Sequence, residues 1–186
     1  MSRKKDKTRS THQLIGNRAR ELGLTREDAF TAYVMDRLLD RLGRSKHAQD
    51  LYLKGGLLVA NLVDAPHRFT RDIDLLRRHG PPSPDELREI FRDIVAVPAD
   101  DGVAFHQGIK AERAEHDADG YDGVKVWLGA TVGKRETSVR IDIGFGDAVA
   151  PPATRRALTP FLADDEPARE EGRTRPSRSS PRSCRP

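Results

Sequence analysis

The segment Asp72-Ile73-Asp74 carries the side chains of this sequence that are best suited to chemistry. On a β-strand, alternate side chains share a face, so the two carboxylates converge while Ile73 faces the other side. Two neighbouring negative charges repel each other unless a cation lies between them. Mg²⁺ is the hard cation that carboxylates, water molecules and substrate phosphates ordinarily share. The spacing therefore predicts that Asp72 and Asp74 are metal ligands and catalytic residues.

A glycine pair precedes this segment. Lys54-Gly55-Gly56 lies between a short strand pattern and a helix pattern, and Asp72 follows sixteen residues after Gly56. Glycines at a helix N-terminus leave backbone N–H groups bare, which suits a phosphate, and Lys54 adds a positive charge. A phosphate cradle beside paired carboxylates is what nucleotidyl transfer needs, with one metal ion at the attacking hydroxyl and a second at the leaving pyrophosphate. We therefore expect Lys54, Gly55 and Gly56 to bind a nucleotide.

Asp142 is the candidate for a third carboxylate. In the pattern from Val139 to Ile143, the branched residues share one face of a strand and Asp142 shares the other face with Arg140. If this strand lies beside the Asp72 strand, Asp142 joins the two-metal Mg²⁺ site and the catalytic set. Trp127 lies between Val126 and Leu128, and we interpret it as a core residue rather than a stacking platform.

Each motif alone has a simpler explanation. A lone Asp-x-Asp is usually a solvated strand end, and a lone Gly-Gly before a helix is usually a tight turn. Their order and secondary-structure context together favour function. No pair among the six His residues has the spacing of metal ligands.

The elements that must position these residues follow from periodicity and from start and stop signals. Thr25 begins an amphipathic helix that Gly43 ends, and Ser83-Pro84-Asp85-Glu86 is a capping box for a helix to Val95. The other expected elements are a short helix over 12–22, strands over 51–53 and 71–76, a helix over 57–62, and strands over 103–113, 123–132 and 138–144. This order predicts an α+β fold in which helices pack on a mixed β-sheet, not a doubly wound one.

Composition bounds the function class. The chain has 186 residues, 36% hydrophobic and 33% charged, and no apolar run long enough to cross a membrane. Its basic N-terminus is not followed by the apolar region of a secretory signal, and Cys184 is its single cysteine. These features predict a cytoplasmic protein without a membrane partner and without a disulfide.

The charge is distributed unevenly along the chain. The first 20 residues carry seven Lys or Arg against one Asp, and residues 167–186 carry six Arg against two Glu. Because the whole chain has a net charge of +4, the body between these ends is acidic. We expect a disordered basic segment over 1–10, a domain over 11–166 and a disordered Arg/Ser/Pro-rich tail over 167–186. The basic ends either attract RNA or DNA through counterion release or are solvated ends without a partner.

The segment LYLKGGLLVANLVDAPHRFTRDIDLL (residues 51–76) resembles the AbiEii/AbiGii toxin family of nucleotidyltransferases, with Thr70 where that family usually has Ser. The leader AYVMDRLLDRLGRS and the later segment VRIDIGFGDAVAPP are also similar to it. The resemblance implies a minimal nucleotidyltransferase fold and the toxin role of a type IV toxin–antitoxin or phage abortive-infection pair. It also implies an NTP substrate, a cognate antitoxin encoded nearby and, as in some members, an RNA acceptor such as the tRNA 3′ end. The motif assigns Gly55, Gly56 and Thr70 to the nucleotide and Asp72 and Asp74 to the metal.

The C-terminal end departs from this family. Its members usually continue with segments that supply a catalytic lysine and a further acidic residue, whereas this chain continues with REEGRTRPSRSSPRSCRP. The change predicts a truncated or frameshifted end, which leaves three hypotheses for the function of the chain. The first is a Mg²⁺-dependent nucleotidyltransferase toxin, the second is an inactive remnant that binds nucleotide or an antitoxin, and the third is an RNA-binding module that depends on the basic tails.

Overall fold

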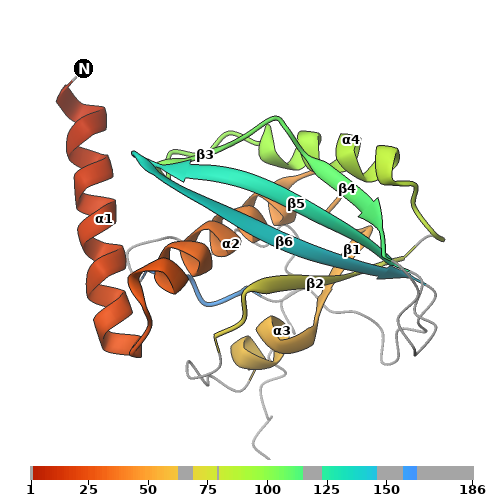
Figure 1. Ribbon diagram of the computed structural model, residues 1–186, viewed down its shortest axis with the longest axis horizontal. Helices are drawn as coiled ribbons and strands as arrows, with labels where there is room; N and C mark the ends of the chain where they lie inside the picture. The colour runs from red at the N-terminus through yellow and green to blue at the C-terminus, as the bar shows by residue number, and fades with distance from the viewer. Residues whose placement is uncertain (1, 63–68, 79, 115–122, 146–156, 163–186) are drawn as a thin grey trace, which may run out of the picture.

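The computed structural model describes residues 2–62, 69–78, 80–114, 123–145 and 157–162 (Figure 1). Four helices and six strands occur in this part of the chain. In chain order they are α1 (Ser2–Leu22), α2 (Arg26–Arg44), β1 (Leu51–Lys54), α3 (Gly55–Leu62), β2 (Asp72–Arg77), α4 (Pro84–Val95), β3 (Val103–Phe105), β4 (Lys110–Arg113), β5 (Gly123–Val132) and β6 (Arg135–Phe145).

The six strands form one mixed sheet. Its order is β1-β2-β6-β5-β3, and β4 also pairs with β5. The β2–β6 pair is parallel, whereas the other pairs are antiparallel. The predicted α+β fold with a mixed sheet is confirmed.

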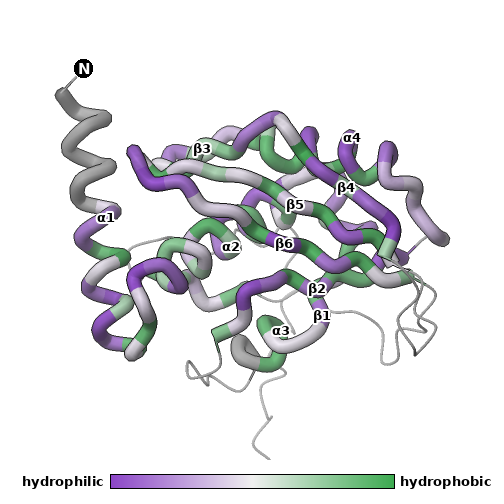
Figure 2. Tube along the Cα trace, in the orientation of Figure 1, coloured by the Kyte–Doolittle hydropathy of each residue, from purple (hydrophilic) through white to green (hydrophobic). Residues whose placement is uncertain are grey.

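One face of the sheet carries the core. Along β5, buried and half-buried residues alternate strictly, so that one side of the strand is apolar and packed (Figure 2). The helices α2 and α4 pack against each other and against this side of the sheet (Figure 1). The fully buried side chains there include Tyr33, Phe30, Phe91, Leu87, Leu128, Ile141 and Ile143. This alternation shows that the core interpretation of Trp127 is wrong, because Val126 and Leu128 take the core face and Trp127 is half-buried on the other.

The predicted helix starts are confirmed by their caps. The Thr25 hydroxyl accepts a hydrogen bond from the Asp28 N–H at 3.1 Å, and the Ser83 hydroxyl accepts one from the Glu86 N–H at 3.1 Å. Each cap satisfies one backbone donor that the first turn of a helix leaves unpaired. The two helices that cover the core therefore start where the sequence predicts.

Two elements differ from the predictions. The first helix begins at Ser2 rather than near His12, so the segment over 2–10, for which we expect disorder, is helical. That segment has no Gly or Pro and is rich in Lys and Arg, which are good helix formers. The single strand expected over 103–113 is two strands, because Phe105 lies opposite Ala130 while Lys110 lies opposite Trp127. Two residues of the edge therefore loop out around Gly108. The tail over 167–186 lies outside the described residues.

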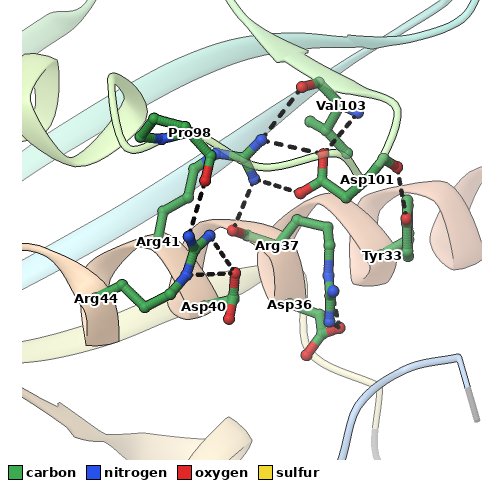
Figure 3. Close-up of polar contacts among 9 residues, drawn as sticks. All are labelled: Tyr33, Asp36, Arg37, Asp40, Arg41, Arg44, Pro98, Asp101 and Val103. Carbon is green, nitrogen blue, oxygen red and sulfur yellow. Dashed lines mark hydrogen bonds and ion pairs between the residues drawn. The ribbon is translucent and has the colours of Figure 1, made fainter. Parts of the chain in front are cut away.

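A buried ion pair fastens the segment between α4 and β3 to α2 (Figure 3). The Arg41 guanidinium donates to both carboxylate oxygens of Asp101, at 2.6 and 3.0 Å, and also to the carbonyl oxygen of Val103. Tyr33 donates to the carbonyl oxygen of Asp101 at 2.7 Å. Both charged side chains are under a tenth exposed. Removing one partner of such a pair leaves an uncompensated buried charge, at a cost of about 3–5 kcal/mol.

Among the described residues, no helix combines the length and the apolar character that crossing a membrane requires.

Candidate active site

The carboxylates predicted to work together lie on two neighbouring strands. In the parallel β2–β6 pair, Asp74 is in register with Asp142 and Asp72 with Arg140. All four residues are on the face opposite the core, because Ile73 and Ile141 alternate with them and are fully buried. The expectation that the Asp142 strand neighbours the Asp72 strand is confirmed.

Arg140 is the cation that lies between two of these carboxylates. Its Nη2 donates to Oδ2 of Asp72 and lies 3.3 Å from Oδ2 of Asp142. The other oxygen of Asp72 accepts a hydrogen bond from the Thr70 hydroxyl at 2.6 Å. The Thr70 hydrogen bond and the charge of Arg140 lower the pKa of Asp72 below its ordinary value. The need for a cation near paired carboxylates is thus met, in the described structure, by a side chain.

Asp74 has the opposite electrostatic environment. Burial raises the pKa of its carboxyl group, and the negative charges of Asp72 and Asp142 raise it further. The positive charge of Lys54 lowers the pKa of Asp74, but this effect is the smaller one. Ionised Asp74 is therefore stabilised less by its surroundings than ionised Asp72 is.

The donor set fits a hard divalent cation. It consists of carboxylate oxygens, which are the ligands that Mg²⁺ prefers. Oδ1 of Asp142 is buried and has no hydrogen-bond partner in the described part of the chain, so a bound cation would satisfy this oxygen. Yet no three His, Cys, Asp or Glu side chains among the described residues are gathered closely enough to hold a metal ion as they stand. A cation at this site therefore requires a rearrangement of the carboxylates that contact Arg140.

The two glycines of the Lys54-Gly55-Gly56 motif have different environments. Gly55 has a φ of 70°, and a Cβ atom there would lie 1.9 Å from Oδ2 of Asp74. Gly55 is therefore needed for the close approach of α3 to the Asp74 carboxylate. A Cβ atom on Gly56 would meet none of the described residues within 4 Å. Among the described residues, Gly56 therefore has the more open surroundings of the two glycines.

Lys54 belongs to the same face as the carboxylates. It lies opposite Asp74 in the β1–β2 pair, and its side chain extends across β2 to Gly144 on β6. A Cβ atom on Gly144 would lie 2.8 Å from Nζ of Lys54, so this glycine makes room for the lysine. The nucleotide-binding role of Lys54, Gly55, Gly56 and Thr70 stays a prediction, and the contact made by Thr70 in the structure is with Asp72.

Sequence reasoning missed the role of Arg140. The alternation that assigned Asp142 to the outer face also assigned Arg140 to it, so the signal was present in the strand pattern. What the sequence does not contain is the register of β2 against β6, which places Arg140 directly beside Asp72.

The chain is similar to several known proteins. Residues 37–174 match the family model described as nucleotidyl transferase AbiEii toxin, type IV TA system. Two solved structures from Helicobacter pylori are similar, a candidate nucleotidyltransferase and JHP933, at 16% and 17% identity and a TM-score of 0.43 each. The similarity covers 69% of this chain in both cases, and the chain spans about half of theirs, 49% and 48%. Comparison with the curated proteins gives no match.

The carboxylate environments predict opposite effects of two conservative substitutions in metal-free protein at neutral pH. Asp72→Asn should lower Tm, because the folded state stabilises the ionised form of Asp72. Asp74→Asn should raise Tm, because burial and like charges disfavour ionised Asp74. Thermal unfolding in EDTA measures both effects. As the pH falls through the raised pKa of Asp74, the folded wild type binds a proton at this carboxylate. The difference in Tm between the wild type and Asp74→Asn should therefore disappear. Equal Tm changes of one sign would contradict these environments.

The glycine pair offers a matched test. Gly55→Ala should lower the free energy of unfolding by about 2 kcal/mol or more, because its positive φ and its contact with Asp74 both exclude a Cβ atom. Gly56→Ala should leave stability unchanged or raise it by up to about 1 kcal/mol, and should weaken binding of a Mg²⁺–NTP. Urea unfolding and calorimetric titration measure the two effects. Nucleotide affinity at the wild-type level in Gly56→Ala would rule out the cradle at that residue.

Proposed function

This chain belongs to the AbiEii family of nucleotidyltransferase toxins, and we propose that it transfers a nucleotide from an NTP to an acceptor hydroxyl in a Mg²⁺-dependent reaction. The observation that supports this proposal most is the parallel β2–β6 register, which aligns Asp74 with Asp142 beside the glycine-initiated helix α3. In such a transfer, the acceptor oxygen forms a bond to the α-phosphorus while the bond to the leaving pyrophosphate breaks.

Different residues of the chain would bind the metal ions and the triphosphate. Asp72, Asp74 and Asp142 supply the carboxylate oxygens that would hold the metal ions of a two-metal site. Bound Mg²⁺ would favour ionisation of the attacking hydroxyl and neutralise charge on the leaving pyrophosphate. The first turn of α3, which contains Gly56, offers backbone N–H groups and the positive end of a helix dipole to the triphosphate. Lys54, which extends across β2, adds a positive charge within the same face.

Arg140 has a second use once a cation compensates the carboxylates. Its side chain is 45% exposed, so it can leave Asp72 and Asp142 without opening the core. A guanidinium released next to the triphosphate can donate two parallel hydrogen bonds to phosphate oxygens. Arg140 would then stabilise the carboxylate cluster before substrate binds and contact phosphate afterwards.

The proposed partners follow from the family. We propose an RNA acceptor such as the tRNA 3′ end, a cognate antitoxin encoded nearby, and action in the cytoplasm. A second candidate is an inactive remnant that binds nucleotide or the antitoxin. The observation that favours it is the contact of Arg140 with two of the carboxylates, because this ion pair opposes metal binding.

A transfer assay tests the proposed function. Each α-³²P-labelled NTP in turn is incubated with the protein, Mg²⁺ and total tRNA. We expect incorporation of label by the wild type and its loss in Asp74→Asn, because this substitution removes a charged ligand at the centre of the cluster. Asp85→Asn is the matched control, because Asp85 lies in the first turn of α4 and its side chain is 90% exposed.

Two results would contradict the proposal. Equal incorporation by the wild type and Asp74→Asn would remove these carboxylates from the reaction. No incorporation with any NTP, by protein that is folded and binds Mg²⁺–NTP, would leave the inactive remnant as the account of this chain.

A further inference from the structure

The carboxylate cluster is one end of a row of side chains that crosses four adjacent strands. In this row, Lys110 on β4 pairs with Trp127 on β5, Trp127 pairs with Arg140 on β6, and Arg140 pairs with Asp72 on β2. Residues that are directly opposite in neighbouring strands point to the same face. Trp127 therefore lies on the active-site face, one strand away from the carboxylates.

Cationic residues lie on the strands next to Trp127. Nζ of Lys110 lies 5.0 Å from the ring centroid and also pairs with Oε1 of Glu112 at 2.9 Å. Lys125 is two residues away on the same face and is in register with Asp142. Lys110 thus contacts the half-buried ring, and Lys125 and Arg140 take neighbouring positions on the same face, which the core helices α2 and α4 do not cover. On this face Lys125 lies between Glu112 on β4 and Asp142 on β6.

An imidazole extends this surface along β5. The His106 ring lies over Gly129, and its Nδ1 is 2.6 Å from the position that a Cβ atom of Gly129 would occupy. The backbone N–H of His106 donates to the carbonyl oxygen of Gly129 at 2.8 Å, which fixes this residue against the strand. Two ring systems, those of His106 and Trp127, therefore lie along the same side of β5 within two residues of register.

Aromatic rings interleaved with cations are the chemistry that binds single-stranded nucleic acid. Bases stack on the ring faces while Lys and Arg neutralise the phosphates. A Trp that only filled the core would lie on the other face with Val126 and Leu128, whereas the Trp127 ring lies on the active-site face in contact with Lys110.

The position of this surface indicates which reactant it binds. The sheet order places α3 and the proposed triphosphate cradle beside β1 and β2, at one side of the carboxylates. Trp127 lies on β5, at the other side. Resting on the proposed function, we propose that Trp127, Lys110 and Lys125 bind the unpaired 3′ end of the acceptor nucleic acid, with a base near that end stacked on the Trp127 ring. The terminal hydroxyl then points toward Asp72, Asp74 and Asp142.

Trp127 is the only tryptophan of the chain, so its fluorescence reports on this surface directly. The wild-type protein is titrated with a short single-stranded oligoribonucleotide without Mg²⁺, so that no transfer can occur. We expect saturable quenching that weakens as salt is added, because phosphate binding releases counterions. Mg²⁺–ATP and blunt duplex RNA are titrated in separate arms, and neither should produce the same quenching.

Variants then separate stacking from charge, with the fluorescence anisotropy of a labelled oligoribonucleotide as the measure of affinity. Trp127→Ala should weaken binding about tenfold or more, whereas Trp127→Phe should retain most of the affinity because a ring remains. Lys125→Gln should weaken binding and reduce its salt dependence. Lys134→Gln is the control, because it removes the same charge at the exposed turn between β5 and β6. Circular dichroism establishes that each variant is folded.

Three outcomes would overturn the proposal. The first is oligoribonucleotide binding without quenching, and the second is equal affinity in the wild type and Trp127→Ala. The third is quenching by Mg²⁺–ATP but not by the oligoribonucleotide, which would assign the ring to the donor base. Asp74→Asn separates this proposal from the proposed function, since it should keep oligoribonucleotide binding while it loses transfer. Binding by both proteins with no transfer by either would contradict only the proposed function.

Discussion

The parallel pairing of β2 with β6 is the constraint on which the site depends, because it fixes negative side chains beside one another. Asp74 lies in register with Asp142, and Asp72 lies two residues before Asp74 on the same face. Such a cluster opposes folding unless positive charge and hydrogen-bond donors compensate for it. The chain supplies Arg140 and the Thr70 hydroxyl for Asp72. The pKa of Asp74 is raised, because burial and then the negative charges of Asp72 and Asp142 disfavour its ionised form.

Strand alternation places the carboxylates on one face of the sheet and the apolar core on the other. Burial of the core side chains compensates for the repulsion among the carboxylates in the free energy of folding. Along β2 and β6, apolar side chains face the core and polar side chains face the opposite side, so Ile73 and Ile141 are fully buried directly between the functional residues. Burial of such side chains contributes about 1.5–3 kcal/mol each. Because β5 and β6 form a long hairpin, the residues of the site face are held in fixed register from β2 to β4.

The sequence predicts the strands and helices of the site well, because capping boxes and strict alternation are local signals. Gly43 is expected to end α2, but the helix continues to Arg44 and its C-cap is Ser45. It also predicts Asp142 as the third carboxylate, because the strand pattern assigns Asp142 to the outer face. Only the pairing of its strand with the Asp72 strand had to be assumed. What local signals do not contain is cross-strand register. The contact of Arg140 with Asp72, the placement of Trp127 opposite Arg140 and the break between β3 and β4 all follow from pairing between distant segments. The helical start of α1 was missed because the prediction gave the charge of residues 2–10 more weight than their helix propensity.

We propose that Asp74 and Asp142 bind a divalent cation, which displaces the Arg140 guanidinium from the carboxylates. Electron paramagnetic resonance of Mn²⁺, which replaces Mg²⁺ at oxygen sites and is visible when free, measures this binding without any turnover. We expect the wild type to bind Mn²⁺, Asp74→Asn and Asp142→Asn to lose that binding, and Arg140→Gln to bind Mn²⁺ more tightly because its competing cation is gone. Mn²⁺ affinity that is the same in all four proteins would contradict the account.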